Sequence, residues 1–143
     1  MKRVLLARGG RLSPFSGLGS THTALEQRLS DGVVEGYTHG ETAQYPGGSG
    51  PVRRLWRRWF SHPKAVQKVT NNYDIVHITD QEQAGLVPEF GNTVVTVHDL
   101  FHLFPSTKHS VEIGNHNPRL IRRKDLDRVK DGIGRAKLLV CIS

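Results

Sequence analysis

Two short apolar segments that end in ionisable residues constrain the fold of this chain more than any other feature. Residues 73–80 (YDIVHITD) and 93–99 (TVVTVHD) are rich in valine and isoleucine and too short for helices, which predicts buried strands of a parallel sheet. Open α/β sheets bind ligands in the crevice beyond the carboxyl ends of their strands. We therefore expect a site at these two ends, which hold His77, Asp80, His98 and Asp99.

Strand-like and helix-like segments alternate along the rest of the chain. The expected strands are residues 2–8, 33–38, 74–79, 92–97 and 137–142, and the expected helices are residues 21–29, 51–72 with a break at Pro63, 81–89 as a short helix or turn, and 120–132. Residues 39–50 and 103–118 are expected to be irregular. This order predicts an α/β, Rossmann-like parallel sheet with helices on both faces. Because the sequence stops directly after a strand, we expect residues 1–143 to form one incomplete domain.

Charge and cysteine content narrow the choice of partners and compartment. The formal net charge of +7 favours anionic partners, whether nucleic acid, anionic lipid or phosphorylated small molecules. The single cysteine, Cys141, cannot form a disulfide within the chain, and its apolar neighbours predict a buried strand thiol. No segment has the roughly 20 apolar residues of a membrane span, and the first apolar stretch is too short for a signal peptide. A cytoplasmic protein is the simplest interpretation.

A glycine- and serine-rich loop, residues 13–20 (SPFSGLGS), connects the first expected strand to the first expected helix. Glycines let a backbone approach a ligand closely, and a helix N-terminus favours anions, so Gly17, Gly19 and Ser20 are candidate ligand contacts. The loop lacks the third glycine of a dinucleotide fingerprint and the lysine of a Walker loop. An ordinary strand-to-helix turn remains an equal alternative.

The end of the fourth expected strand holds a histidine followed by an acid. His98 could bind a sugar hydroxyl or transfer a proton, and Asp99 could orient it or cap the next turn. A buried histidine bonded to the backbone is the alternative, and it is favoured when this pair is considered alone. His77 is expected in the core, whereas Asp80 is expected at the rim of the crevice.

Metal binding is a further possibility, because the chain has eight histidines. His98 and His102 have the spacing of two ligands on a helix, but paired cysteines and an HExxH motif are absent from the sequence. We expect no dedicated metal site.

Residues 52–60 (VRRLWRRWF) divide on a helical wheel into an apolar side and an arginine side. Aromatic residues opposite arginines are typical of a helix that lies on an anionic membrane. The candidate membrane contacts are Arg53, Arg54, Trp56, Arg57, Arg58 and Trp59. A helix packed on the sheet with solvated arginines is an almost equal alternative. Nucleic acid is not favoured, because base-stacking motifs are absent elsewhere.

Four segments together resemble the N-terminal domain of glycosyltransferase family 4, which has GT-B architecture. They are residues 16–19 (SGLG), 73–80, 94–100 (VVTVHDL) and 136–143 (AKLLVCIS), and their order and spacing match over nearly the whole chain. The resemblance implies retaining transfer of a sugar from a nucleotide-sugar donor to an acceptor, usually without a metal and with no cofactor beyond the donor.

The same resemblance implies roles for individual residues. Gly17 and Gly19 would approach the donor phosphates, and His98 would contact the donor sugar with Asp99 in support. Many members act on lipid-linked acceptors at membranes, so the basic helix predicts a peripheral protein at the inner face of the membrane. The family's C-terminal domain, which grips the nucleotide and has paired glutamates, is absent from this sequence, and Gly17-Leu-Gly19 is leaner than the usual Gly-Gly-x-Gly.

We therefore expect the isolated chain to be inactive until a second chain or domain completes the cleft. Two other functions stay open from the sequence. One is a non-catalytic binding subunit of a split glycosyltransferase, and the other is a basic α/β module that binds lipid or nucleic acid.

Overall fold

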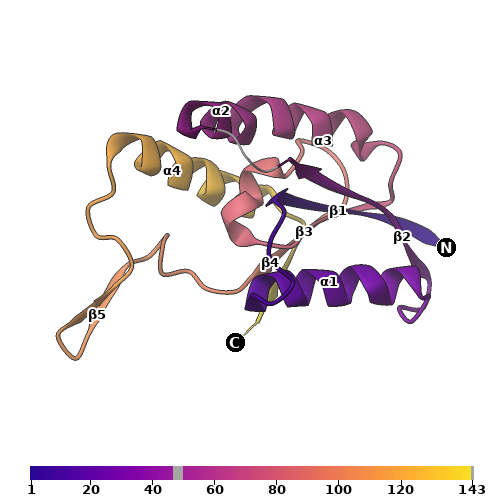
Figure 1. Ribbon diagram of the computed structural model, residues 1–143, viewed down its shortest axis with the longest axis horizontal. Helices are drawn as coiled ribbons and strands as arrows, with labels where there is room; N and C mark the ends of the chain where they lie inside the picture. Colours follow the sequence, from indigo (N-terminus) through magenta and orange to yellow (C-terminus); the bar gives the residue numbers. More distant parts are fainter. Residues whose placement is uncertain (47–49, 143) are drawn as a thin grey trace.

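A five-stranded parallel sheet forms the centre of the protein in the computed structural model, which describes residues 1–46 and 50–142 (Figure 1). Its strands are β1 (Lys2–Gly10), β2 (Tyr37–Tyr45), β3 (Ile75–Ile78), β4 (Thr93–Val97) and β7 (Leu138–Cys141). They lie in the order β2-β1-β3-β4-β7, and every neighbouring pair is parallel. The predicted α/β, Rossmann-like fold is confirmed.

Helices cover both faces of the sheet. Helix α1 (Gly17–Ser30) lies on one face, and the other helical segments lie on the opposite face (Figure 1). Those segments are α2 (Pro51–Trp56), the π-helical turn η1 (Arg57–Ser61), α3 (His62–Thr70), the 3₁₀ helix η2 (Gln81–Leu86) and α4 (Leu120–Arg135). A protruding hairpin of β5 (Ser106–Lys108) and β6 (Val111–Ile113) precedes α4, where an irregular segment was expected.

Strand β1, which lies between β2 and β3, is buried on both faces. Val4 and Leu6 pack with Leu29 of α1, whereas Leu5 and Ala7 belong to the larger core under α3, η2 and α4. This alternation follows from the two-residue period of a strand. Burying a leucine side chain contributes about 1.5–3 kcal/mol, so the apolar run in β1 stabilises both layers.

Strand β2 corrects the sequence-based expectation. A strand was expected at residues 33–38 and an exposed loop at 39–50, but the strand begins at Tyr37 and ends at Tyr45. As an edge strand it is mostly half-buried, so its polar residues do not show the apolar pattern of β3. Gly40 allows the ring of Tyr73 to approach, because a Cβ at position 40 would clash with that ring. The glycine therefore marks close packing rather than a loop.

The opposite edge strand, β7, is exposed along its whole length. The expectation of a buried Cys141 is wrong, because the thiol lies on this edge strand and is exposed. Hydrophobic side chains at Leu138, Leu139 and Val140 are also 40–56% exposed. Its apolar sequence alone could not distinguish a covered strand from this uncovered edge.

The direction of chain progression across the sheet reverses between β1 and β3, because β2 lies on one side of β1 and all later strands lie on the other. Ligand crevices of open α/β sheets form at such a reversal, outside the carboxyl ends of the strands. The loop after β1 and the residues after β3 meet at this place. The next question is which side chains they bring together.

Candidate functional site

Thr79, the first residue after β3, joins three segments of the crevice. Its hydroxyl oxygen lies 2.9 Å from Nδ1 of His22 in α1, and its carbonyl oxygen lies 3.1 Å from Nε2 of His98 after β4. The start of α1, the end of β3 and the end of β4 therefore converge at one buried threonine. The structure thus brings His98 and helix α1, which follows the glycine loop, together at the carboxyl edge of the sheet.

The position of His98 is fixed from two sides. Its backbone N–H donates to Oε1 of Gln81 at 2.9 Å, and its Nε2 contacts the Thr79 carbonyl. A carbonyl oxygen only accepts hydrogen bonds, so Nε2 carries the proton and Nδ1 of the neutral ring has a free lone pair. Nδ1 can accept a hydrogen bond or a proton. The neighbouring Asp99 is exposed, and the described contacts include no hydrogen bond between its carboxylate and His98.

His22 is almost fully buried, with 1% of its surface exposed. Burial, helped by the positive charge of Arg8, lowers its pKa to about 4, so the ring is neutral at pH 7. Its Nε2 has no hydrogen-bond partner among the described residues, and the carboxylate of Glu26 lies 3.7 Å away. The ring therefore holds Thr79 from the helix side while one of its nitrogens stays unsatisfied.

The glycine loop contributes backbone geometry to the crevice. Helix α1 begins at Gly17, earlier than the expected residue 21, and Ser16 caps it by accepting a hydrogen bond from the N–H of Gly19 at 3.1 Å. Gly19 is buried, and a Cβ at this position would clash with the carbonyl oxygen of Ser13. Gly17 is exposed and has open space where a Cβ would lie. The hydroxyl of Ser20 donates back to the Gly17 carbonyl at 2.9 Å.

The other two strand-end residues have different roles. Asp80 caps η2 by accepting from the N–H of Glu82 at 2.9 Å, and burial raises its pKa despite this hydrogen bond. His77 lies on the opposite face of β3 from the Val76 and Ile78 core, as expected, with Nε2 2.8 Å from the hydroxyl of Thr96. Burial lowers the pKa of His77 to about 4.

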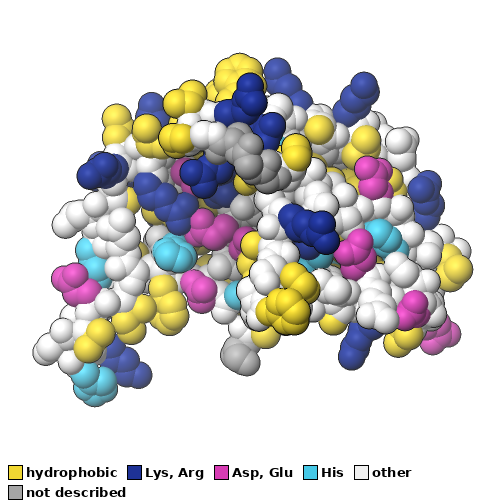
Figure 2. All heavy atoms as spheres, viewed as in Figure 1, with side chains coloured by type: hydrophobic (Ala, Val, Ile, Leu, Met, Phe, Trp, Pro, Cys, Tyr) yellow, Lys and Arg dark blue, Asp and Glu magenta, His cyan; other side chains and the backbone are white. Residues whose placement is uncertain are grey.

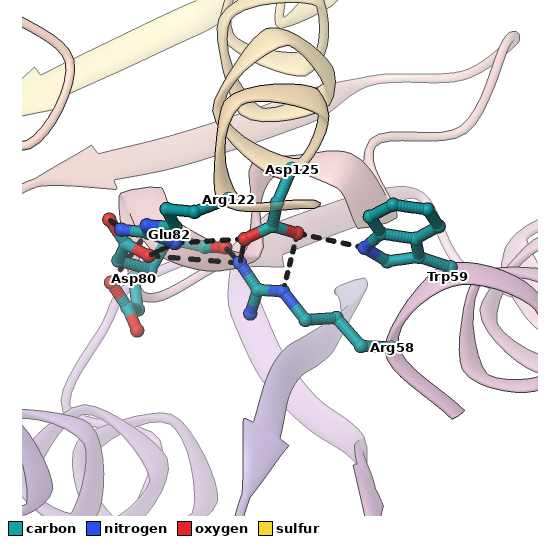
Figure 3. A network of polar contacts seen from close by, with 6 residues as sticks. All are labelled: Arg58, Trp59, Asp80, Glu82, Arg122 and Asp125. Atoms are coloured by element: carbon teal, nitrogen blue, oxygen red, sulfur yellow. Dashed lines mark hydrogen bonds and ion pairs between the residues drawn. The ribbon is translucent and has the colours of Figure 1, made fainter. Parts of the chain in front are cut away.

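On the other face of the sheet, an ionic network joins η1, η2 and α4 (Figure 3). Asp125 accepts hydrogen bonds from Nε of Arg58 at 2.8 Å, Nε1 of Trp59 at 3.0 Å and Nη1 of Arg122 at 2.8 Å. Arg122 also binds Glu82, at 3.0 Å from Nη2 to Oε1. Burial alone would raise the pKa of Asp125, but hydrogen bonds from Arg58 and Trp59 and the charges of the two arginines lower it.

A proline explains one further contact between these helices. Pro63 has no N–H to donate to the carbonyl four residues earlier, that of Trp59. Nη2 of Arg128 in α4 donates to this carbonyl at 3.0 Å, and the guanidinium lies 5.7 Å from the indole centroid. The carbonyl thus gains a partner from another helix.

The structure separates the six candidate membrane contacts into two groups. Arg58 and Trp59 point toward Asp125 in the interior, so the wheel's division into two clean sides does not describe the folded helix (Figure 3). Arg53, Arg54 and Trp56 are exposed, and Arg57 is half-buried with Nη1 2.9 Å from the Pro46 carbonyl. Figure 2 shows Lys and Arg side chains with hydrophobic side chains between them over the α2–α3 side.

The sequence did not predict the residues that hold His98 in position. Thr79 and Gln81 position His98, and His22 contacts Thr79. One signal was available for Thr79, because it directly precedes Asp80 at the end of an expected strand. His22 gave no such signal, since its burial depends on how α1 packs on the sheet.

Two features of the described ranges bear on ligand and membrane classes. Within residues 1–46 and 50–142, no three His, Cys, Asp or Glu side chains are grouped so that they could hold a metal ion. Over the same ranges, no helix has both the length and the apolarity needed to cross a bilayer. In comparisons with protein-family models, with curated proteins and with solved structures, the chain matches none of them.

Proposed function

We propose that this chain is the N-terminal, acceptor-side half of a retaining glycosyltransferase of GT-B architecture. In this proposal the complete protein transfers a sugar from a nucleotide-sugar donor to an acceptor, and a second domain or chain supplies the donor nucleotide site. The observation that supports it most is the convergence of His22, Thr79 and His98 at the carboxyl edge of the parallel sheet.

The chemistry of this edge suits a polyhydroxylated ligand. Nδ1 of His98 offers a hydrogen-bond acceptor at the mouth of the crevice, fixed in place by Thr79 and Gln81. Helix α1, which follows the glycine loop, begins at the same edge and directs its positive end there. A sugar hydroxyl at His98 and a phosphate near Gly17 would occupy adjacent parts of one crevice.

The positive end of α1 and the His98 imidazole cannot by themselves catalyse transfer of a sugar. Catalysis requires groups on both sides of the reacting bond in a site that excludes water. In this proposal the isolated chain is therefore inactive. Asp99 is the exposed residue next to His98. It also places the protein in the cytoplasm, consistent with a single cysteine and no disulfide within the chain.

The test titrates uridine, guanosine and adenosine diphosphate sugars into the ¹⁵N-labelled chain and follows backbone amide shifts. We expect shifts at Gly17, Thr79 and His98, with loss of the response in His98→Ala. The matched control is His102→Ala, because His102 is an exposed histidine four residues away. The chain joined to its downstream coding sequence is then assayed for donor hydrolysis. Equal responses in both variants would refute the site.

A second role, contact with an anionic membrane, is favoured by a separate observation. Val52, Trp56 and Phe60 follow one another every four residues and are 81%, 61% and 43% exposed. The rings of Trp56 and Phe60 lie 4.8 Å apart, so they form one apolar stripe beside the exposed Arg53. An apolar stripe bordered by arginines fits the interface of an anionic bilayer.

Vesicle flotation tests this second role. We expect Trp56→Ala with Phe60→Ala to weaken binding to vesicles that contain phosphatidylglycerol, and binding to pure phosphatidylcholine to be weak from the outset. The control is Phe90→Ala, since Phe90 is 78% exposed on a different part of the surface. Unchanged flotation of the double variant would exclude the stripe as the contact.

A further inference from the structure

A cavity of about 250 Å³ lies between the end of β2 and helix α2. Its walls are formed by Tyr45, Pro51, Arg54, Leu55 and Arg58. Tyr45 is the last residue of β2, so the cavity opens at the carboxyl edge of the sheet. It is separate from the crevice at His98, since the two share no residue.

The tyrosine wall of this cavity packs against a buried histidine. The Tyr45 ring meets the His62 ring edge-on, with centroids 5.2 Å apart and an interplanar angle of 89°. Nε2 of His62 in turn lies 2.7 Å from the carbonyl oxygen of Arg8 in β1. His62 is buried, and burial lowers its pKa, so a neutral ring fixes the tyrosine against the sheet.

The two arginines of the cavity keep unused hydrogen-bond donors. Nε and Nη2 of Arg58 bind Asp125, whereas Nη1 points away from that carboxylate and has no partner among the described residues (Figure 3). The guanidinium of Arg54 is exposed and has no hydrogen-bond or ion-pair partner within the described part of the chain. Both side chains come from one helical stretch, four residues apart, and therefore lie on the same side of it.

The local charge favours an anion. Glu82 and Asp125 are balanced by Arg58 and Arg122, which bind both carboxylates. Arg54 has no ion-pair partner among the described residues, so one positive charge remains beside them. Guanidinium groups bind phosphate through planar pairs of N–H donors, and Nη1 of Arg58 adds a donor without adding net charge. A phosphate offers three acceptor oxygens to these donors, more than a carboxylate does.

We propose that this cavity binds a phosphate group through the guanidinium of Arg54 and Nη1 of Arg58, with Tyr45 as one of its walls. The volume supports a small ligand, because pockets for drug-sized molecules measure about 300–1,000 Å³. A whole nucleotide sugar is larger than this cavity, whereas a phosphate with a short substituent fits. The phosphate belongs either to a small soluble metabolite or to a lipid headgroup, and the proposal does not depend on glycosyl transfer.

The experiment measures phosphate binding by the full chain directly. Inorganic phosphate and glycerol 3-phosphate are titrated at physiological salt and followed by ¹⁵N NMR, with acetate as the carboxylate control. In a second arm, the chain is sedimented with phosphatidylcholine vesicles that contain phosphatidic acid. The test variant is Arg54→Gln, and the matched control is Arg28→Gln, which removes the same charge from an exposed position of α1 on the opposite face of the sheet, outside the cavity and the apolar stripe.

We expect phosphate to shift the signals of Tyr45, Arg54 and Leu55 and acetate to shift them far less. Arg54→Gln should raise the dissociation constant about tenfold, and Arg28→Gln less than about twofold. Because Arg54 is exposed and has no partner among residues 1–46 and 50–142, its variant should keep the wild-type melting temperature, which is measured alongside.

The two arms identify the source of the phosphate. Selective loss of soluble phosphate binding in Arg54→Gln supports a small metabolite. No soluble binding, together with selective loss of vesicle binding in Arg54→Gln, supports a lipid headgroup. Equal effects of Arg28→Gln and Arg54→Gln in both arms would show a response to net charge alone and overturn the proposal, as would the absence of binding in both arms.

Discussion

Nε2 of His98 lies 3.1 Å from the main-chain carbonyl oxygen of Thr79. The carbonyl can only accept, so this contact selects the tautomer with the proton on Nε2. In the neutral form of the ring, Nδ1 is then the nitrogen that can accept a hydrogen bond. This one backbone contact therefore decides which ring nitrogen a ligand hydroxyl can donate to.

The tautomer of His98 is directly measurable. We expect ¹⁵N NMR of the imidazole nitrogens at pH 7.5 to show a protonated Nε2 and an unprotonated Nδ1. Gln81→Leu removes the acceptor of the His98 backbone N–H and should broaden or shift the His98 signals. A predominantly Nδ1-protonated ring in the wild-type chain would contradict the assignment.

The two glycines of the loop should differ sharply in their tolerance of a methyl group. Gly19→Ala should lower the free energy of unfolding by about 1–3 kcal/mol, because the new Cβ clashes with the Ser13 carbonyl. Gly17→Ala should be neutral or slightly stabilising, because the space there is open and alanine favours the helix. Urea denaturation of both variants checks this, and equal effects would contradict it.

Arg128 and Pro63 should be energetically coupled. Arg128→Met removes the donor to the Trp59 carbonyl and should cost about 1 kcal/mol of stability. In a Pro63→Ala background the restored N–H can serve that carbonyl, so Arg128→Met should cost less. A double-mutant cycle measures this coupling, with Arg123→Met as the control on the exposed side of α4. Additive effects would show that the two residues act independently.

Acid should destabilise the fold through buried His22 and half-buried His77, and His62, whose pKa is also lowered by burial, acts in the same direction. His22 and His77 have pKa values of about 4 in the folded protein, whereas an unfolded histidine has a pKa of about 6.5. Between these values the unfolded state binds more protons, so stability is full above pH 6.5 and falls as the pH drops toward 4. The expected loss is on the order of 3 kcal/mol for each histidine.

Urea midpoints at pH 7.5 and pH 4.5 measure this loss. His77→Gln and His22→Gln should each be less stable than wild type at pH 7.5 but lose less stability on acidification. His102→Gln, at an exposed position, should follow the wild-type pH dependence. Asp80 acts in the opposite direction, because burial raises its pKa, and it is unchanged in all of these variants. A wild-type midpoint that does not move with pH would contradict the prediction.

The buried strands were predictable because burial from water selects apolar residues, and these stand out in the sequence. Strands β3 and β4 are continuous apolar runs, and their positions were predicted within one residue at each end. The position of strand β2 was not predicted, because an edge strand buries little apolar surface. Its sequence is therefore mostly polar and resembles that of a loop. The exposure of β7 could not be predicted either, since covering an edge depends on the rest of the architecture.

The candidate site was predictable only for residues whose place follows from their position at the end of a strand. His98 could be placed at a strand end, but its partner Thr79 lies on a neighbouring strand 19 residues away. The helical wheel placed Arg58 and Trp59 by the geometry of one helix alone, and Asp125 is 67 and 66 residues away from them. Long-range partners of this kind leave no local pattern in a single sequence.

The contacts of Asp125 also have an evolutionary consequence. One carboxylate accepts from Arg58, Trp59 and Arg122, so its replacement would take the acceptor from the indole N–H and leave both guanidinium groups to share Glu82. A lineage that lost the carboxylate would be under pressure to change those three positions together. Among relatives of this protein, positions 58, 59, 122 and 125 should therefore vary as a set, while exposed Arg54 drifts independently unless a ligand restrains it.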